Sequence, residues 1–111
     1  HQLPAQHVKT HPLPYGLLYY LNGKSILLIN RDMESRMPVN NTETKTDIDY
    51  VIISGNPYIR ADFLLSCVNI GQLIIDSSNK PSKARFYQNA FKKANIKVWN
   101  VAVQGAYTTT L

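Results

Sequence analysis

The sequence contains little cysteine and little charge. Cys67 is the one cysteine among 111 residues, so an intrachain disulfide and a zinc site built from several cysteines are both excluded. Charged residues make up 17% of the chain, below the ~25% typical of proteins, which excludes a long solvated helical rod. No apolar run reaches the ~18 residues of a transmembrane helix. The apolar fraction of 44% is nevertheless enough for the packed core of one domain.

The N-terminal residues 1–14 contain three prolines and show no periodicity, which predicts an extended segment preceding a single α/β domain over residues 15–111. The chain begins without Met, and no signal-peptide pattern follows, so we interpret it as a piece of a longer protein. His1, His7 and His11 are the only histidines, and all lie in this segment. We expect them to bind zinc only adventitiously, because no acidic residue lies near them in sequence.

A β-hairpin is the strongest local prediction. The apolar stretches Gly16–Leu21 and Lys24–Asn30 flank Asn22-Gly23, the residue pair that best tolerates the positive φ angles of a type I′ turn. The polar stretch Arg31–Thr46 follows and has neither helical nor strand periodicity. We expect it to form a loop.

Two short apolar runs, Tyr50–Ile53 and Leu73–Ile75, are typical of buried parallel strands. Between them, Arg60–Val68 suits a short helix that Gly71 would end. Parallel strands need such a crossover, so this region predicts a β-α-β unit.

An apolar stripe at helical spacing predicts a second helix over Lys83–Asn95, with Ser82 as its cap. Lys97–Val103 alternates as a strand does, and Ala106–Thr110 is predicted to be a last strand after a turn at Gln104-Gly105. The fold class is therefore α/β, a β-hairpin followed by β-α-β-α-β-β. Two helices cover a sheet of this size on one face only, so the other face needs a cover from elsewhere.

Polar residues follow both buried strands. The carboxyl ends of neighbouring parallel strands meet at one edge of a sheet, where ligands bind in open α/β folds. We expect one polar rim there, either a binding site or two turns whose polar groups satisfy one another. Its members are Ser54, Gly55, Asn56, Asp76, Ser77, Ser78, Asn79 and Lys80.

The net charge of +5 is unevenly distributed. Residues 1–76 sum to −1, whereas residues 77–111 carry six Lys or Arg and no acid. Such a cluster favours a polyanionic partner such as DNA, although a solvated basic helix face is the alternative interpretation. The candidate DNA-contacting residues are Lys83, Arg85, Lys92, Lys93 and Lys97.

Three short motifs carry a family resemblance: Ile53–Pro57, Ile74–Asn79 and Gly105-Ala106. From Asp49 to its end, the chain resembles the last half of the metallo-β-lactamase-like domain at the C-terminus of ComEC-type competence proteins, the inner-membrane DNA-uptake channels. The similarity is to the divergent form seen in the Bacteroidetes group. It implies half of a metallo-β-lactamase-like fold.

The same resemblance argues against metal chemistry. The catalytic form of the family has metal-binding histidines where this chain has Gly55 and Asn56, and a further His-Pro ligand where it has Lys80-Pro81. Asn30-Arg31-Asp32 resembles the Gly-Asp that bridges the metals, with Arg31 in place of the glycine. We therefore expect no catalytic residues, no metal and no cofactor.

Two functions remain open at this point. The first is a non-catalytic accessory domain of a competence-related DNA-uptake membrane protein, with weak, sequence-independent DNA contact. The second is a hydrolase of the metallo-β-lactamase-like class that uses the rim near Asp76. The expected partners are DNA and the remainder of the parent chain, and the parent would lie in the bacterial inner membrane with this part extracytoplasmic.

Overall fold

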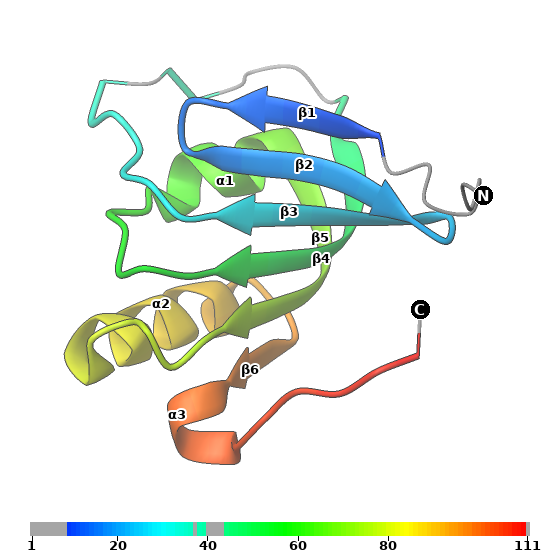
Figure 1. Cartoon of the computed structure of the whole chain (residues 1–111). Coiled ribbons are helices and arrows are strands. Elements are labelled where there is room, and N and C mark those ends of the chain that lie inside the picture. Colours follow the sequence, from blue (N-terminus) through cyan, green and yellow to red (C-terminus); the bar gives the residue numbers. More distant parts are fainter. Residues whose placement is uncertain (1–8, 37, 40–43, 111) are drawn as a thin grey trace.

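A single six-stranded sheet organises the chain (Figure 1). The structure, a computed structural model, describes residues 9–36, 38–39 and 44–110. The strands are β1 (Thr10–Leu13), β2 (Gly16–Leu21), β3 (Lys24–Ile29), β4 (Thr46–Ile53), β5 (Val68–Ile75) and β6 (Val98–Asn100), and they lie side by side in chain order. The helices are α1 (Ala61–Cys67), α2 (Pro81–Lys93) and α3 (Val101–Gln104). The α/β class predicted from the sequence is confirmed.

The β2–β3 hairpin forms as predicted. Leu21 pairs with Lys24, so the turn contains only Asn22 and Gly23. Both have positive φ angles, 51° and 77°, as a type I′ turn requires. Glycine and asparagine adopt this region at the lowest cost, which explains why these two residues close the hairpin.

The remainder of the sheet is parallel. β3, β4, β5 and β6 run in the same direction, and α1 and α2 form the crossovers between the last three. Gly71 was predicted to end the first helix, but α1 ends at Cys67 and Gly71 lies inside β5. A Cβ atom at Gly71 would sit 2.7 Å from the Asp49 carbonyl oxygen, so close strand approach, not helix termination, explains this glycine.

The core lies between the sheet and the two longer helices. Alternate residues of the central strands point at α1 and α2, and Leu64, Tyr87 and Phe91 of these helices pack against them. The buried strand residues on this side are Leu27, Ile29, Val51, Ile53, Leu73 and Ile75. The connection between β3 and β4 contributes Met33, which is 3% exposed. The predicted loop is confirmed at its described positions up to Lys45, but its last residue, Thr46, begins β4. Residues 37 and 40–43 lie outside the described part.

The start of α2 differs from the prediction. The helix begins at Pro81, and Lys80 is its N-cap, with no side-chain hydrogen bond. Ser82 is therefore the second helical residue and not the cap. Proline is favoured at the first helical position because its fixed φ suits the helix and its missing N–H would have had no intrahelical partner.

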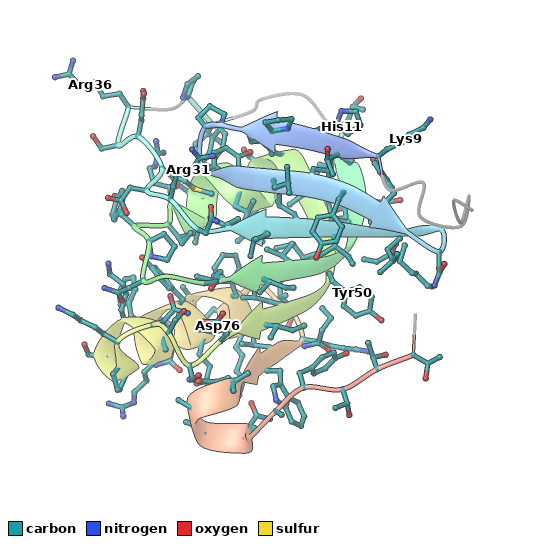
Figure 2. The ribbon with its side chains drawn as sticks, viewed as in Figure 1. Lys9, His11, Arg31, Arg36, Tyr50 and Asp76 are labelled. Carbon is teal, nitrogen blue, oxygen red and sulfur yellow. The ribbon has the colours of Figure 1, made fainter. Side chains whose placement is uncertain are left out.

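The predicted extended N-terminal segment contains β1, which the sequence analysis did not identify. Thr10–Leu13 pairs antiparallel with β2 at the edge of the sheet despite Pro12. His11 lies on this strand (Figure 2), and its ring meets that of Tyr20 edge to face at 6.2 Å. His1 and His7 fall outside the described residues.

The C-terminal prediction was wrong in two places. Strand β6 ends at Asn100, Val101–Gln104 is the helical turn α3, and residues 105–110 form no strand. The cause is local capping: the Asn100 side chain accepts the Ala102 N–H at 3.2 Å, and the Gln104 side chain accepts the Asn100 N–H at 2.9 Å. These side-chain bonds compete with the ladder bonds that continued alternation would have formed.

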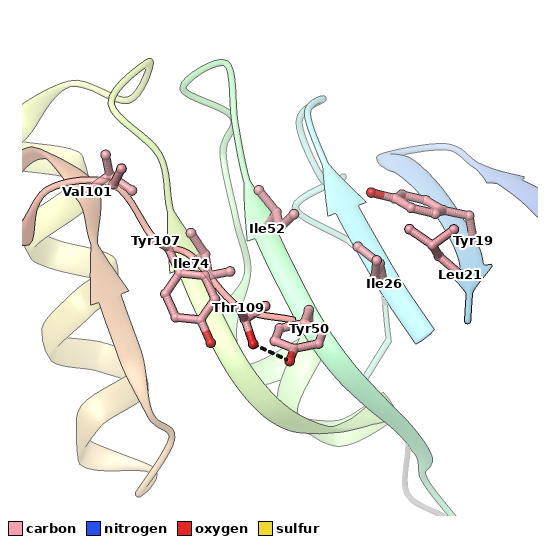
Figure 3. Close-up of a pocket in the computed structure, with 10 residues that line it drawn as sticks. Tyr19, Leu21, Ile26, Tyr50, Ile52, Ile74, Val101, Tyr107 and Thr109 are labelled. Carbon is pink, nitrogen blue, oxygen red and sulfur yellow. Dashed lines mark hydrogen bonds between the residues drawn. The ribbon is translucent and has the colours of Figure 1, made fainter. Parts of the chain in front are cut away.

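The C-terminal segment turns back over the sheet face opposite α1 and α2 (Figure 3). Trp99 Nε1 donates to the Gly105 carbonyl at 2.7 Å, and Tyr107 meets the rings of Trp99 and Tyr50 at 5.6 and 6.4 Å. Tyr50 and Thr109 join their hydroxyls at 3.4 Å. Among the described residues, no helix is long and apolar enough to cross a membrane.

Candidate functional site

The structure places the predicted rim at the carboxyl ends of β4 and β5. The Ser54 N–H donates to the Ile29 carbonyl at 3.0 Å, and the Asp76 N–H donates to the Ile53 carbonyl at 3.1 Å. These bonds extend the parallel pairing by one residue beyond each strand end. Asp76 follows β5 directly (Figure 2), so the two turns leave the sheet next to each other.

Ser78 connects the two turns. Its Oγ accepts the Gly55 N–H at 2.6 Å and lies 3.3 Å from Ser54 Oγ. The same hydroxyl donates to Asp76 Oδ1, which also accepts the Ser78 N–H at 3.0 Å. One serine hydroxyl therefore contacts groups on both turns, and the Asp76 carboxylate holds it in place.

Two asparagines make a second, reciprocal connection. Asn79 Oδ1 accepts the Asn56 N–H at 3.0 Å, and Asn56 Oδ1 accepts the Lys80 N–H at 2.9 Å. Asn79 Nδ2 donates to the Ile53 carbonyl at 2.9 Å. Asn79 is only 4% exposed, so its amide satisfies backbone groups that water does not reach.

Backbone conformation explains two of the residue types at the rim. Gly55 and Asn56 have φ angles of 82° and 62°, the left-handed region that glycine and asparagine adopt most readily. Ser77 and Lys80 have exposed side chains at the outside of the second turn. The structure thus brings all eight predicted rim residues together, and four of their described polar bonds join one turn to the other.

The donor set at the rim does not suit a catalytic metal. It offers a single carboxylate, Asp76, together with hydroxyls, amides and the cations of Lys80 and Lys83. Asp32, the residue at the resembled bridging position, accepts the Tyr58 N–H at 2.7 Å, and Arg31 Nη2 donates to the Leu13 carbonyl at 3.2 Å. Among the described residues, no group of three His, Cys, Asp or Glu side chains is placed to hold a metal ion.

The candidate DNA-contacting cations divide into two sets. Arg85, Lys92 and Lys93 are exposed on α2, and Lys97 is exposed just before β6. Lys83 is half-buried, and its Nζ donates to the Asn56 carbonyl at 3.1 Å. At about 100° per residue, Lys83 lies roughly half a turn around the helix from Arg85 and Lys92. The five cations therefore do not form one face.

A groove lies beside the rim, and no sequence pattern predicted it. It has a volume of about 340 Å³ and is lined by Tyr58, Ile59, Ser82, Lys83, Phe86 and Tyr87. Tyr58 and Phe86 are 45% and 69% exposed, whereas Ile59 and Tyr87 are 4% and 3% exposed. The only signal in the sequence was Phe86, a large apolar residue outside the apolar stripe of its helix.

The floor of this groove is held firmly. The Tyr87 hydroxyl donates to the Pro57 carbonyl at 2.9 Å and accepts the Ile59 N–H at 2.9 Å. Burial raises the pKa of the Tyr87 hydroxyl, so this side chain stays neutral and keeps its donor at physiological pH. The segment that follows β4 is thereby fixed against α2.

Comparison with known proteins gives one family. The model of the ComEC C-terminal domain matches residues 3–111. The chain belongs to the ComEC C-terminal domain family. Neither the curated proteins nor the solved structures give a match. The family match confirms the resemblance to the C-terminal domain of ComEC-type proteins and associates this ComEC domain with a competence-related protein of DNA uptake. The metallo-β-lactamase-like fold that the resemblance implied stays a prediction.

Proposed function

We propose that this ComEC domain is a non-catalytic accessory domain that contacts DNA weakly and without sequence preference. One observation carries the proposal: residues 77–111 hold six cations and no acid, and Arg85, Lys92 and Lys93 stand exposed on one helix. Exposed cations on a rigid element attract a phosphate backbone and release its counterions, which is the basis of sequence-independent binding.

The exposed cations of α2 form a usable stripe. Arg85 and Lys92 are seven residues apart, which places them on nearly the same side of the helix, about 10 Å apart along its axis. Asn89 is exposed between Arg85 and Lys92, and Lys93 is the next residue after Lys92. This helix surface, defined by Arg85, Asn89, Lys92 and Lys93, would meet about three phosphates.

The non-catalytic part of the proposal is supported by the rim. A hydrolase using the rim near Asp76 would need a free nucleophile or a metal-bound water. The Ser78 hydroxyl instead donates a hydrogen bond to Asp76 and accepts one from the Gly55 N–H. No histidine is adjacent to it among the described residues. The parent protein would hold this domain at the bacterial inner membrane, on the extracytoplasmic side, where incoming DNA is met.

Fluorescence anisotropy with labelled single-stranded DNA across a salt series tests the DNA contact. The dissociation constant should fall in the non-specific range of ~10⁻⁴–10⁻⁶ M. If three phosphates are contacted, the logarithm of the association constant should fall linearly with the logarithm of the salt concentration. The slope should be about −2, at ~0.7 per phosphate.

The charge-reversed variant Lys92→Glu/Lys93→Glu should lose most of this binding. Lys9→Glu/Arg36→Glu is the matched control, because it changes the net charge equally at two exposed cations that lie away from α2 (Figure 2). Equal losses in the two variants would show that only net charge matters and would contradict a contact surface on α2.

A further inference from the structure

The groove between α2 and the segment after β4 combines features that the basic helix surface lacks. Two exposed aromatic side chains, Tyr58 and Phe86, border it, and Lys83 contributes a cation at its edge. Large apolar side chains gathered at one exposed depression favour an interaction site, because their exposure to water costs solvation free energy. We propose that this groove, defined by Tyr58, Phe86, Tyr87 and Lys83, stacks a nucleobase of single-stranded DNA.

The shape of the groove suits a flat, apolar ligand with a charged neighbour. Its volume of about 340 Å³ lies within the ~300–1,000 Å³ range of small-molecule pockets. Ring faces of Tyr and Phe bind any base, because every base has a π-face, and this stacking does not depend on sequence. A base held there leaves its phosphate outside, next to the cation at the edge.

Charge complementarity selects the nucleic acid over an apolar peptide. Lys83 uses one of its three donors on the Asn56 carbonyl and keeps two for a phosphate. Phe86 lies on the outer side of α2, and Lys93 follows it by seven residues, so a strand leaving the groove along the helix reaches a second cation. The lining of the groove includes no carboxylate, and the Asp32 Oδ1 accepts the Tyr58 N–H, so the phosphate belongs on the Lys83 side.

The groove is preformed, which lowers the cost of binding. Its floor consists of buried Ile59 and Tyr87, and the Tyr87 hydroxyl is fixed by two backbone groups. Phe86 meets the Tyr87 ring edge to face at 6.0 Å. A ligand therefore orders little besides the Phe86 and Tyr58 side chains, and ordering entropy is the main penalty that preorganisation removes.

This inference rests on the proposed DNA contact and adds base stacking to it. The test uses the 111-residue chain and a single-stranded oligonucleotide carrying 2-aminopurine, whose fluorescence is quenched by stacking. An abasic oligonucleotide of equal charge serves as the second probe. Phe86→Ala and Tyr58→Ala are the test variants, and Tyr20→Ala is the matched control, since Tyr20 is 38% exposed on β2, away from the groove.

Phe86→Ala should weaken binding of the base-bearing oligonucleotide by about 5-fold or more, the lower limit of ~1–3 kcal/mol per stacked base. It should also abolish the quenching, while leaving the salt slope and the affinity for the abasic oligonucleotide unchanged. Tyr58→Ala should act in the same direction, and Tyr20→Ala should retain both affinity and quenching.

Two results would overturn the stacking site. One is unchanged affinity and quenching in Phe86→Ala; the other is equal wild-type affinity for the base-bearing and abasic probes. In either case the Lys92→Glu/Lys93→Glu variant decides separately whether the phosphate contact on α2 stands. If wild-type protein binds neither probe at low salt, both the stacking site and the proposed function fail.

Discussion

The two faces of the sheet are built from the same strands but are covered in different ways. On one face, Ile53, Leu73 and Ile75 are fully buried beneath α1 and α2. On the other face, Tyr50 and Ile52 are only half-buried, and the described cover is the C-terminal segment. An open depression of about 420 Å³ remains beside this segment. Regular helices therefore complete one core, whereas a segment without regular structure closes part of the other face.

The two faces should contribute differently to the stability of the fold. The helix-covered face is made of interdigitated apolar side chains, whose removal leaves cavities. The open face depends on a few aromatic edge contacts and two hydrogen bonds, centred on Tyr107 and Trp99. We expect mutations on the two faces to differ several-fold in their effect on the free energy of unfolding.

The largest effect is expected on the covered face. Phe91→Ala removes a fully buried ring from α2 and should lower the free energy of unfolding by about 3–5 kcal/mol. Urea unfolding followed by circular dichroism measures the change. Phe86→Ala is the matched control on the same helix, and because Phe86 is 69% exposed it should cost less than about 0.5 kcal/mol. Similar costs would contradict the assignment of the core.

The rim should respond as part of the covered core. Asn79→Ala leaves the buried Ile53 carbonyl and the Asn56 N–H without their side-chain partner, at a cost of about 1–3 kcal/mol. Asn89→Ala changes the same group at an exposed helical position and should cost much less. The same urea titration compares the two, and equal costs would show that the connection between the turns contributes nothing to stability.

The open face should tolerate truncation better. Tyr107→Ala removes two edge-to-face ring contacts. Each such contact contributes about 0.5–1.5 kcal/mol to the free energy of unfolding. Trp99 should also become more exposed, so its fluorescence emission should shift to longer wavelength. Thr108→Ala is the neighbouring control and should leave the emission unchanged. An unshifted emission in Tyr107→Ala would show that this segment does not depend on Tyr107.

The smallest effect is expected where Ser25, at the start of β3, meets Asp49 in β4. The Ser25 N–H and hydroxyl donate to Asp49 Oδ2 at 2.9 and 3.2 Å, and these bonds, the backbone one foremost, hold the pKa of Asp49 below its usual 3.8. A carboxylate whose pKa is lower in the folded than in the unfolded state stabilises the fold. This contribution is fully present at pH values above the unfolded-state pKa, and it is lost as the pH falls through the folded-state pKa. Stability should therefore decline below about pH 4.

Replacing the carboxylate should reduce this acid sensitivity. Asp49→Asn should show a smaller difference between urea midpoints at pH 6 and pH 3 than the wild type. Ser25→Ala should lie between the two, because it removes the hydroxyl bond and keeps the larger backbone bond. An unaltered pH dependence in Asp49→Asn would show that this carboxylate is not stabilised by its two bonds.

Local patterns predicted those parts of the fold that short-range chemistry determines. The Asn22-Gly23 pair fixed the hairpin because its φ requirement excludes most alternatives. Strand β1 was missed because Pro12 argues against a strand, and only its pairing with β2 makes one. Strand β6 was predicted too long because Val98–Val103 alternates, while the bonds of Asn100 and Gln104 turn the chain into α3.

The candidate sites divide in the same way. The rim could be predicted from topology, because the carboxyl ends of neighbouring parallel strands meet at one edge of the sheet. Polar residues follow both β4 and β5 in the sequence. The groove could not be predicted, because Tyr58 and Phe86 lie far apart in sequence and meet only when α2 packs against the segment after β4. Helical spacing alone predicts that Lys83 lies on a different side of α2 from Arg85 and Lys92. The hydrogen bond from Lys83 to the Asn56 carbonyl could not be predicted, because it depends on the geometry of the rim.

The two outermost strands determine how this sheet behaves among other copies of itself. An unpaired strand edge is a template for intermolecular pairing, and hence for aggregation. At one edge β1 has only four residues and contains Pro12, which lacks an N–H to offer. At the other edge β6 has three residues before the Asn100 cap bends the chain into α3. Both ends of the sheet thus resist further strand addition, which favours solubility for a domain whose strands are otherwise rich in Ile, Leu and Val.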